Sequence, residues 1–281
     1  MSQLIQMRQR INAIGTIKKI THATRLIAMS AHTRLANREP IMAHYKEEVK
    51  RLFGRLLADE ETAGALPPVA YNPKAKQTLI VLVGSQKGFC GMFNSMLFKF
   101  LENHFSTQKH NHVFIAVGKK AHDYLSSQSA TVLTSFTTLS SSTIGSIADV
   151  ITTTIIQQAH LYNTVVVINN YPKSFFNQKP QQTLLLPIEQ QARLDLELDA
   201  YYWPEAKHEL VKILSSLYIH ASVEALLLSS LTAEQAARFH SMDSATRNAQ
   251  DLLETLNRDF NKLRQTKITK ELIELSGSFH K

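Results

Sequence analysis

Residues 205–276 contain neither glycine nor proline, and this stretch limits the possible folds more than any other part of the sequence. Glycine and proline are the strongest helix breakers, so a segment of this length without them favours one long helix. At 1.5 Å per residue, ~70 helical residues span roughly 100 Å, which is more than one compact domain can cover. We therefore expect a long helix that needs a partner along part of its length.

Apolar residues in the second half of this stretch recur at the spacing of a coiled coil. Intervals of three and four residues separate them, with one extra step before the last two, so they predict a seam with an imperfect register. The predicted seam consists of Met242, Ala245, Ala249, Leu252, Leu256, Phe260 and Leu263. A helix start at Thr232 is the competing interpretation, because Thr232 and Gln235 have the spacing of a capping box.

The first 57 residues show a similar pattern, with a basic helix at 18–36 whose other positions are mostly small. Their apolar residues begin with intervals of three, four and three residues, which again indicates a helix–helix seam. The predicted seam consists of Leu4, Met7, Ile11, Ile14, Ile17, Ile20 and Ile27. Gly15 is unfavourable within such a helix, and Pro40 predicts a kink or a local opening because proline removes a backbone donor.

The middle of the chain has a different pattern, in which short β-rich runs alternate with helical segments. The β-rich runs are residues 78–83, 113–117 and 164–169, and the helical patterns lie near 92–104, 119–127 and 143–162. This alternation predicts βαβ units in a mostly parallel sheet. We interpret residues 58–76 as a linker into this region and residues 175–182 as a loop before a last apolar run.

Together these patterns predict an α/β protein with a long antiparallel coiled coil of N- and C-terminal helices. A Rossmann-like α/β domain of mostly parallel strands is inserted between the two helices. The predicted boundaries are 1–57 for the N-terminal coiled-coil helix, 58–204 for the inserted domain and 205–281 for the long C-terminal helix.

The composition favours an acidic partner and a reducing compartment. Net charge is +8 and the pI is about 9.5, which suits nucleic acid, an anionic membrane surface or an acidic protein patch. The single cysteine cannot form an internal disulfide. No apolar run approaches the ~20 residues of a membrane-spanning helix, and the N-terminus has no features of a targeting segment.

The turn "VGSQKGFCGMFN" at residues 83–94 is the one candidate for small-molecule chemistry. Gly84, Gly88 and Gly91 could expose backbone N–H groups to a phosphate, but their spacing matches neither common nucleotide-binding loop. A tight strand-to-helix turn is the alternative. Cys90 would need a base such as His104 or His122 to act as a nucleophile, and a buried structural cysteine is the simpler interpretation.

Neither a metal site nor a nucleic-acid motif is evident. The histidines form one close pair, in "KHNH" at 109–112, without metal-ligand spacing. Basic residues line both terminal helices, so a nucleic-acid-binding coiled coil remains an alternative, although no known DNA- or RNA-binding pattern is present. These residues are Arg8, Arg10, Lys18, Lys19, Arg25, Arg34, Arg238, Arg247, Arg258, Lys262, Arg264, Lys267 and Lys270.

Three segments resemble one known family, the gamma subunits of F-type ATP synthases. "IKKITHATRLIAMSAHTRLA" at 17–36 is similar to the N-terminal signature of that family, and "GSQKGFCGMFNSML" at 84–97 is similar to its Asp-Arg-Gly-Leu-Cys-Gly-Gly-Leu-Asn segment. The strongest resemblance is at 229–275, where Glu-Gln-Ala-Ala-Arg, Met-x-x-Ala-Thr-x-Asn-Ala, Arg-Gln and Ile-Thr-x-Glu-Leu-x-Glu follow in order. The resemblance covers both ends and the middle of the chain.

The resemblance implies a central rotor shaft that runs through a ring of α and β subunits and couples ion flow to ATP chemistry on the β subunits. The implied contacts with acidic β-subunit loops are Arg238, Arg264, Gln265, Thr269, Glu271, Lys18, Lys19 and Arg25. Leu272, Ile273 and Leu275 match an apolar bearing, and Tyr201 and Tyr202 match the foot on the membrane c ring.

The resemblance also implies an epsilon subunit as a further partner. It implies no nucleic-acid partner, transmembrane segment, catalytic residue, cofactor or metal on this chain, and a peripheral location on the cytoplasmic face of the bacterial inner membrane. The sequence departs from the family at several places. Gln86 and Lys87 stand where the family has Asp-Arg. His22, Thr24 and His32 are unusual for the N-terminal signature. In the tail, Gly277 comes one place earlier than the family's glycine. These departures indicate a divergent or alternate bacterial form.

Overall fold

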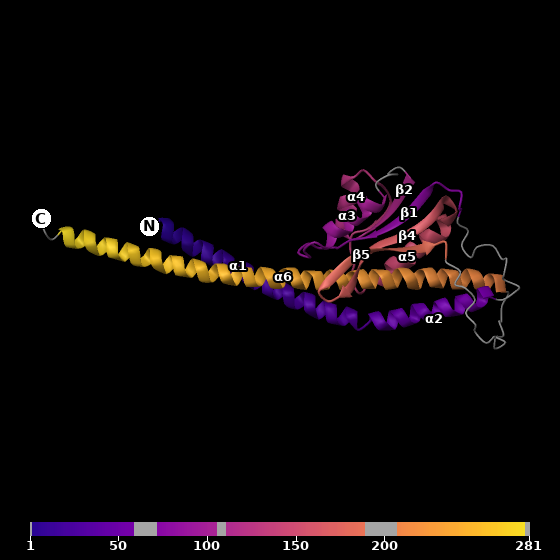
Figure 1. The fold of residues 1–281 in the computed structure, drawn as a ribbon, viewed down its shortest axis with the longest axis horizontal. Coiled ribbons are helices and arrows are strands. Elements are labelled where there is room, and N and C mark those ends of the chain that lie inside the picture. Colours follow the sequence, from indigo (N-terminus) through magenta and orange to yellow (C-terminus); the bar gives the residue numbers. More distant parts are fainter. Residues whose placement is uncertain (1, 59–71, 106–110, 189–206, 279–281) are drawn as a thin grey trace. The chain divides into compact units, whose positions relative to one another are not determined.

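The computed structural model describes residues 2–58, 72–105, 111–188 and 207–278 (Figure 1). The chain forms two compact units, one made of Met1–Met29 with Arg238–Lys281 and the other of Ser30–Ala237. Three helices carry the ends of the chain: α1 (Ser2–Ala36), α2 (Glu39–Ala58) and α6 (Lys207–Ser278). Both α1 and α6 contribute residues to each unit. The predicted boundaries at 57/58 and 204/205 stay predictions.

Helix α6 is continuous over 72 residues, as the absence of breakers predicts. The alternative helix start at Thr232 is wrong. Thr232 lies in the interior of α6, where its Oγ1 donates to the carbonyl oxygen of Leu228 at 3.0 Å. In a helix interior, a threonine hydroxyl can donate to a carbonyl oxygen of the preceding turn. Thr232 does this and therefore does not cap a helix N-terminus.

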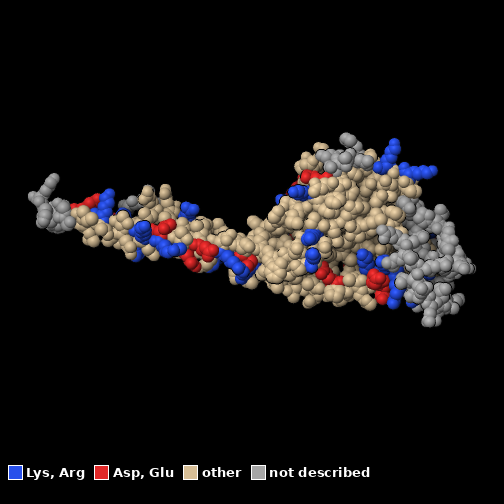
Figure 2. All heavy atoms as spheres, in the orientation of Figure 1, with Lys and Arg blue, Asp and Glu red and all other residues tan. Residues whose placement is uncertain are grey.

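The N-terminal helix breaks where Pro40 predicts it. Asn37 and Arg38 form a turn between α1 and α2, and Pro40 occupies the first turn of α2, where its missing N–H would have no intrahelical partner. Gly15 does not interrupt α1. Helices α1 and α6 lie side by side in the first unit (Figure 1), and Lys and Arg side chains alternate with Asp and Glu along its visible face (Figure 2).

The second unit is built on a five-stranded sheet with the order β3-β2-β1-β4-β5. Its strands are β1 (Gln77–Val83), β2 (His112–Val117), β3 (Thr131–Phe136), β4 (Tyr162–Ser174) and β5 (Asn177–Leu186). The first four are parallel to one another, and β5 is antiparallel to β4. Further helices are α3 (Phe93–Phe105), α4 (Lys119–Ser127), α5 (Ile144–Gln158) and a 3₁₀ turn at Ala159–Leu161.

The three predicted strands correspond to β1, β2 and β4, but the two edge strands differ from the prediction. Strand β3 was not predicted, and the predicted loop at 175–182 is wrong because β5 begins at Asn177. Only Phe175 and Phe176 form the turn of this hairpin. Edge strands expose one side to water, so polar residues such as Thr, Ser, Gln and Lys replace the continuous apolar runs of central strands.

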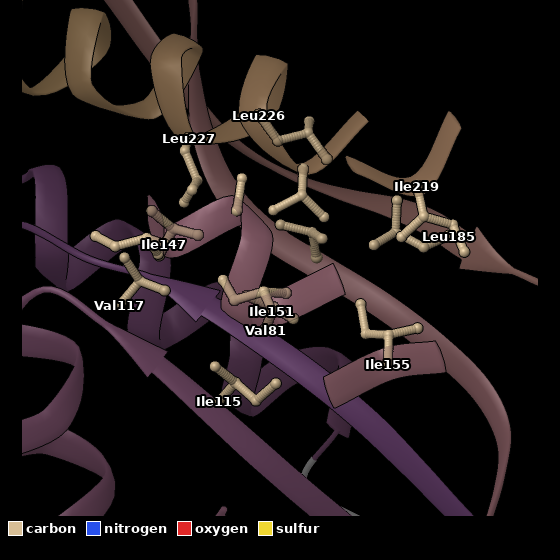
Figure 3. Close-up of a cluster of buried hydrophobic side chains, with 14 of the residues drawn as sticks. Val81, Ile115, Val117, Ile147, Ile151, Ile155, Leu185, Ile219, Leu226 and Leu227 are labelled. Carbon is tan, nitrogen blue, oxygen red and sulfur yellow. The ribbon is translucent and has the colours of Figure 1, made fainter. Parts of the chain in front are cut away.

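Apolar side chains cover both faces of the sheet. On one face, Val81 and Ile115 pack with Ile151 of α5 and with Leu227 of α6 (Figure 3). On the other face, side chains of β1, β2 and β4 pack with α3 and α4, as Leu97 does. Parallel strands with two covered faces must be apolar throughout, which explains the sequence of β1.

Helix α6 is, among the described helices, the one long and apolar enough to cross a membrane by length and composition alone. Its apolar residues between 219 and 231 belong to the core of the second unit. Ile219, Val223 and Leu227 are each at most 1% exposed there. Packing against the sheet therefore accounts for this apolar segment.

Ile151 offers a test of this core. Its side chain is fully buried between the sheet and α6, so we expect Ile151→Ala to lower the free energy of unfolding by ~2–5 kcal/mol. Urea unfolding of the full chain, followed by circular dichroism, measures the change. The control is Val150→Ala on the same helix, where the side chain is 47% exposed and the loss should stay below ~0.5 kcal/mol. Equal losses would contradict this description of the core.

Candidate interaction site on the helical pair

Side-chain hydrogen bonds join α1 to α6 in the first unit. Arg25 Nη1 donates to Asp243 Oδ1 at 2.6 Å, and Thr246 Oγ1 donates to Thr21 Oγ1 at 2.9 Å. Lys18 Nζ also donates to Gln250 Oε1. From Lys18 to Arg25 on α1, the bonded residue on α6 moves back from Gln250 to Asp243. The two helices are therefore antiparallel, as predicted.

The seam on α1 is more regular than the sequence-based prediction and partly different from it. It alternates intervals of three and four residues without interruption, through Leu4, Met7, Ile11, Ile14, Lys18, Thr21, Arg25 and Ala28, all buried or half-buried. The predicted continuation is wrong, because Ile17, Ile20 and Ile27 are 47%, 60% and 69% exposed. The prediction followed apolar residues only. The seam instead continues through the polar residues Lys18, Thr21 and Arg25, and each of them bonds to a polar side chain on α6.

The seam on α6 is also regular. It follows Met242, Thr246, Ala249, Leu253, Leu256 and Phe260, so the predicted extra step does not exist. The predicted seam residues Ala245 and Leu252 each come one position before an observed seam residue. Leu252 and Leu263, which was also predicted, are each 37% exposed. The error has the same cause as on α1, because Thr246 occupies a seam position that an apolar pattern assigns to its neighbour.

Asp243 is the electrostatic centre of this contact. Its two carboxylate oxygens accept from Arg25 and from Arg247, the latter at 2.7 Å, and 17% of its side chain is exposed. The hydrogen bond from Arg25 lowers the pKa of Asp243 below its ordinary value, and the positive charge of Arg247 adds to this effect. The ionised carboxylate is therefore favoured in the folded pair.

The structure divides the predicted β-subunit contacts into two groups. Lys18 and Arg25 are half-buried and bind partners on α6, while Arg238 is buried with 8% exposure. The exposed group consists of Lys19, Arg264, Gln265, Thr269 and Glu271. Glu271 also lies 3.5 Å from the ammonium of Lys267. A partner would meet the exposed group directly, and the contacts themselves stay predictions.

The C-terminal end of α6 exposes large apolar side chains. Continuing the antiparallel register places Ser2 level with about residue 266, and α6 runs on to Ser278. The predicted bearing residues Leu272, Ile273 and Leu275 are 61%, 64% and 58% exposed there. Tyr201 and Tyr202, predicted for the foot, lie outside the described residues.

The glycine turn after β1 is closed by its own side chains. The backbone N–H of Ser85 donates to Asn94 Oδ1 at 3.0 Å, while Asn94 Nδ2 donates to Ser85 Oγ at 2.8 Å and lies 3.3 Å from Cys90 Sγ. A side chain at Gly84 would meet the backbone nitrogen of Ala121 at 3.0 Å. Close packing therefore explains Gly84, and a tight strand-to-helix turn describes this segment.

Cys90 is buried at 3% exposure and packs with Phe93, Ala233 and Ala237. His104, considered as its base, has Nδ1 at 2.8 Å from the carbonyl oxygen of Phe100. These surroundings suit a structural cysteine. Among the residues that the structure describes, no three His, Cys, Asp or Glu side chains gather to hold a metal ion.

Comparison with known proteins gives one consistent result. The family model described as "ATP synthase" matches residues 3–280. "ATP synthase gamma chain" of Chlorobium luteolum is 31% identical over 99% of this chain and 98% of its own length. The protein of the same name from Rickettsia prowazekii is 29% identical over 98% of each chain.

Solved structures show the same fold. One is a chain from a structure of the Euglena gracilis mitochondrial ATP synthase that contains OSCP, F1 and c-ring. The two chains align with a TM-score of 0.70 and 15% identity, and the alignment covers 99% of this chain and 94% of the Euglena chain. Another is a chain from a structure of the Tetrahymena thermophila mitochondrial ATP synthase central stalk and c-ring. The two chains align with a TM-score of 0.60 and 21% identity, and the alignment covers 80% of this chain and 99% of the Tetrahymena chain.

The Asp243 contact should make the stability of the helical pair depend on pH. Because the folded state lowers the pKa of Asp243, its contribution is fully present above the unfolded value of about 3.9 and disappears as pH falls through the folded pKa. We expect Asp243→Asn to destabilise the full chain by about 0.5–1 kcal/mol at pH 7, and this difference from the parent should shrink as pH falls below the unfolded pKa of about 3.9.

Urea unfolding at a series of pH values measures this difference. Asp251→Asn removes an exposed carboxylate from the same helix and is the matched control. A pH-independent difference for Asp243→Asn, or an equal one for Asp251→Asn, would show that the ion pair does not stabilise the fold.

Proposed function

This chain belongs to the ATP synthase family, among its gamma chains, and from that premise we propose that it forms the central rotor shaft of an F-type ATP synthase. The shaft couples ion translocation through the membrane c ring to ATP synthesis or hydrolysis on the β subunits. The chemistry takes place on other subunits, and this chain needs no catalytic residue, cofactor or metal of its own.

The observation that carries this proposal is the exposed apolar surface of the helical pair. Ile20 and Ile27 on α1 are 60% and 69% exposed, and Leu272 and Ile273 on α6 are 61% and 64% exposed. They form two separate sets, one on the exposed side of α1 and one near the end of α6, and exposed sets of large apolar side chains usually mark an interface. A ring of subunits around the pair would remove them from water.

Charge supports the same partners. The chain carries a net charge of +8, and Lys19 and Arg264 are exposed on the two paired helices. Acidic loops of the β subunits would complement these cations. Gln265, Thr269 and Glu271 lie on the same exposed segment of α6 and would add polar contacts.

A further contact of this chain would be with the membrane part of the enzyme. We assign Tyr201 and Tyr202 to the foot on the c ring and include an epsilon subunit among the partners. The assembly would lie at the cytoplasmic face of the bacterial inner membrane, with this chain as a peripheral subunit. The coiled coil would bind no nucleic acid, since its basic residues serve protein contacts.

The helical pair can transmit rotation because its two helices differ in sequence. Each β subunit around the shaft would face a different surface at any instant, for example the isoleucines of α1 or the charged side of α6. Turning the shaft changes which surface each β subunit meets. Nucleotide affinity at the β sites would then cycle with rotation, as coupling through a rigid element with several orientations.

Co-expression with the α and β subunits from the same genome tests this function. With a purification tag on β, we expect this chain to co-purify with the ring and the ATPase activity of the ring to depend on it. A chain that stays apart from α and β would contradict the rotor assignment.

Arg264→Glu tests one predicted contact within that complex. We expect ATP-driven ion pumping to fall about two- to fivefold, the factor for losing one exposed ion pair of ~0.5–1 kcal/mol, while assembly is retained. Fluorescence quenching of a pH- or ion-sensitive dye in membrane vesicles measures pumping. Lys99→Glu, on the exposed side of α3, is the charge-matched control. Normal pumping by Arg264→Glu would remove Arg264 from the predicted contacts.

A further inference from the structure

Helix α1 carries two possible seams that differ by one residue. After Ile14 the observed seam continues through Lys18, Thr21, Arg25 and Ala28. The alternative seam continues through Ile17, Ile20, Thr24 and Ile27, each one residue earlier. Neighbouring residues on a helix are about 100° apart, so turning this part of α1 by one residue would exchange the two seams.

Apolar burial alone favours the seam that the structure does not use. Ile17, Ile20 and Ile27 are 47%, 60% and 69% exposed, and the alternative seam would bury all three. It would also return the charged groups of Lys18 and Arg25 to water. Another interaction must therefore hold α1 in its observed rotational setting.

Polar groups on α6 supply that interaction. Asp243, Thr246 and Gln250 each bond to a seam residue of α1. In the alternative setting these three groups would face threonine and isoleucine side chains instead of Arg25, Thr21 and Lys18. A half-buried carboxylate or amide that loses its partner is penalised strongly, and polar seam residues are known to set helix register in this way.

Gly15 lies at the point where the two seams diverge. Leu4 to Ile14 fit both seams, so the choice between them is made in the turn that contains Gly15. A glycine lowers the resistance of a helix to local changes in winding. The sequence thus allows rotation at this point, and side-chain contacts further along must oppose it.

We propose that the pairs Arg25–Asp243, Thr21–Thr246 and Lys18–Gln250 form a rotational lock. The lock selects which face of α1 points outward and keeps the isoleucines on the surface, against the preference of apolar burial. Its members are positioning residues. The proposal concerns the two helices of this chain and stands or falls independently of the rotor function.

Two cysteine reporters distinguish the two settings in the full chain. Both are made with Cys90→Ser, which removes the single native cysteine. The native reporter is Thr21→Cys/Thr246→Cys, at positions whose hydroxyl oxygens are 2.9 Å apart. The rotated reporter is Ile20→Cys/Thr246→Cys, at a position that now faces away from α6. Because both reporters replace Thr246, the ratio of their disulfide-formation rates reports the rotational setting held by the two remaining pairs, Arg25–Asp243 and Lys18–Gln250.

Asp243→Arg should open the lock, because it places a second guanidinium against Arg25. We expect the rotated-to-native ratio to rise at least about tenfold, within the range of coupling between residues in contact. Arg25→Glu/Asp243→Arg restores an opposite-charge pair and should return the ratio to its original value. Lys19→Glu, on an exposed residue of the same helix, should leave the ratio unchanged.

An unchanged ratio in Asp243→Arg, or no recovery in the charge-swapped pair, would overturn the proposal. Circular dichroism shows whether Asp243→Arg keeps its helices. If it loses them, Arg25→Gln provides the decisive measurement, because it removes the charge but adds no repulsion. We then expect the ratio to rise about threefold, and an unchanged ratio in that variant would equally overturn the lock.

Discussion

The pairing of α1 with α6 is the contact on which the rest of the structure depends. A helix of 72 residues cannot bury a face on its own, and α6 solves this problem differently along its length. Between residues 219 and 231 it packs on the sheet, where a wide apolar surface is buried. From Met242 to Phe260 it packs on one helix, where a narrow seam is sufficient. Because the partner comes from the opposite end of the chain, the α/β region must be inserted between them.

Most of the fold could be predicted from the sequence, because its strongest signals come from groups buried on all sides. The breaker-free helix and the apolar runs of β1, β2 and β4 are signals of this kind. The edge strands β3 and β5 were missed because exposed polar side chains dilute their pattern. Thr232 gave a false helix start, since a threonine hydroxyl can bond either at a cap or to the preceding turn.

The interaction site was harder to predict because its residues act in pairs. The exposed Lys19 and Arg264 agree with a basic surface, which composition already indicates. Lys18 and Arg25 look equally basic in sequence, yet they point to partners on the other helix. A single sequence cannot show that Asp243 lies opposite Arg25, because they are 218 residues apart. Only the pairing register decides which cations remain for another protein.

The helical pair inverts the usual distribution of polar and apolar side chains over three layers of its seam. Polar groups meet between the helices, while isoleucines of α1 face outward. In an isolated coiled coil this arrangement would be unfavourable, because water would cover the apolar face. In a shaft enclosed by other subunits, both faces of α1 are interfaces, and the outer face must slide past several partners. Apolar contacts have no fixed direction and suit that surface, whereas directional hydrogen bonds suit the inner seam, whose geometry must not change as the shaft turns.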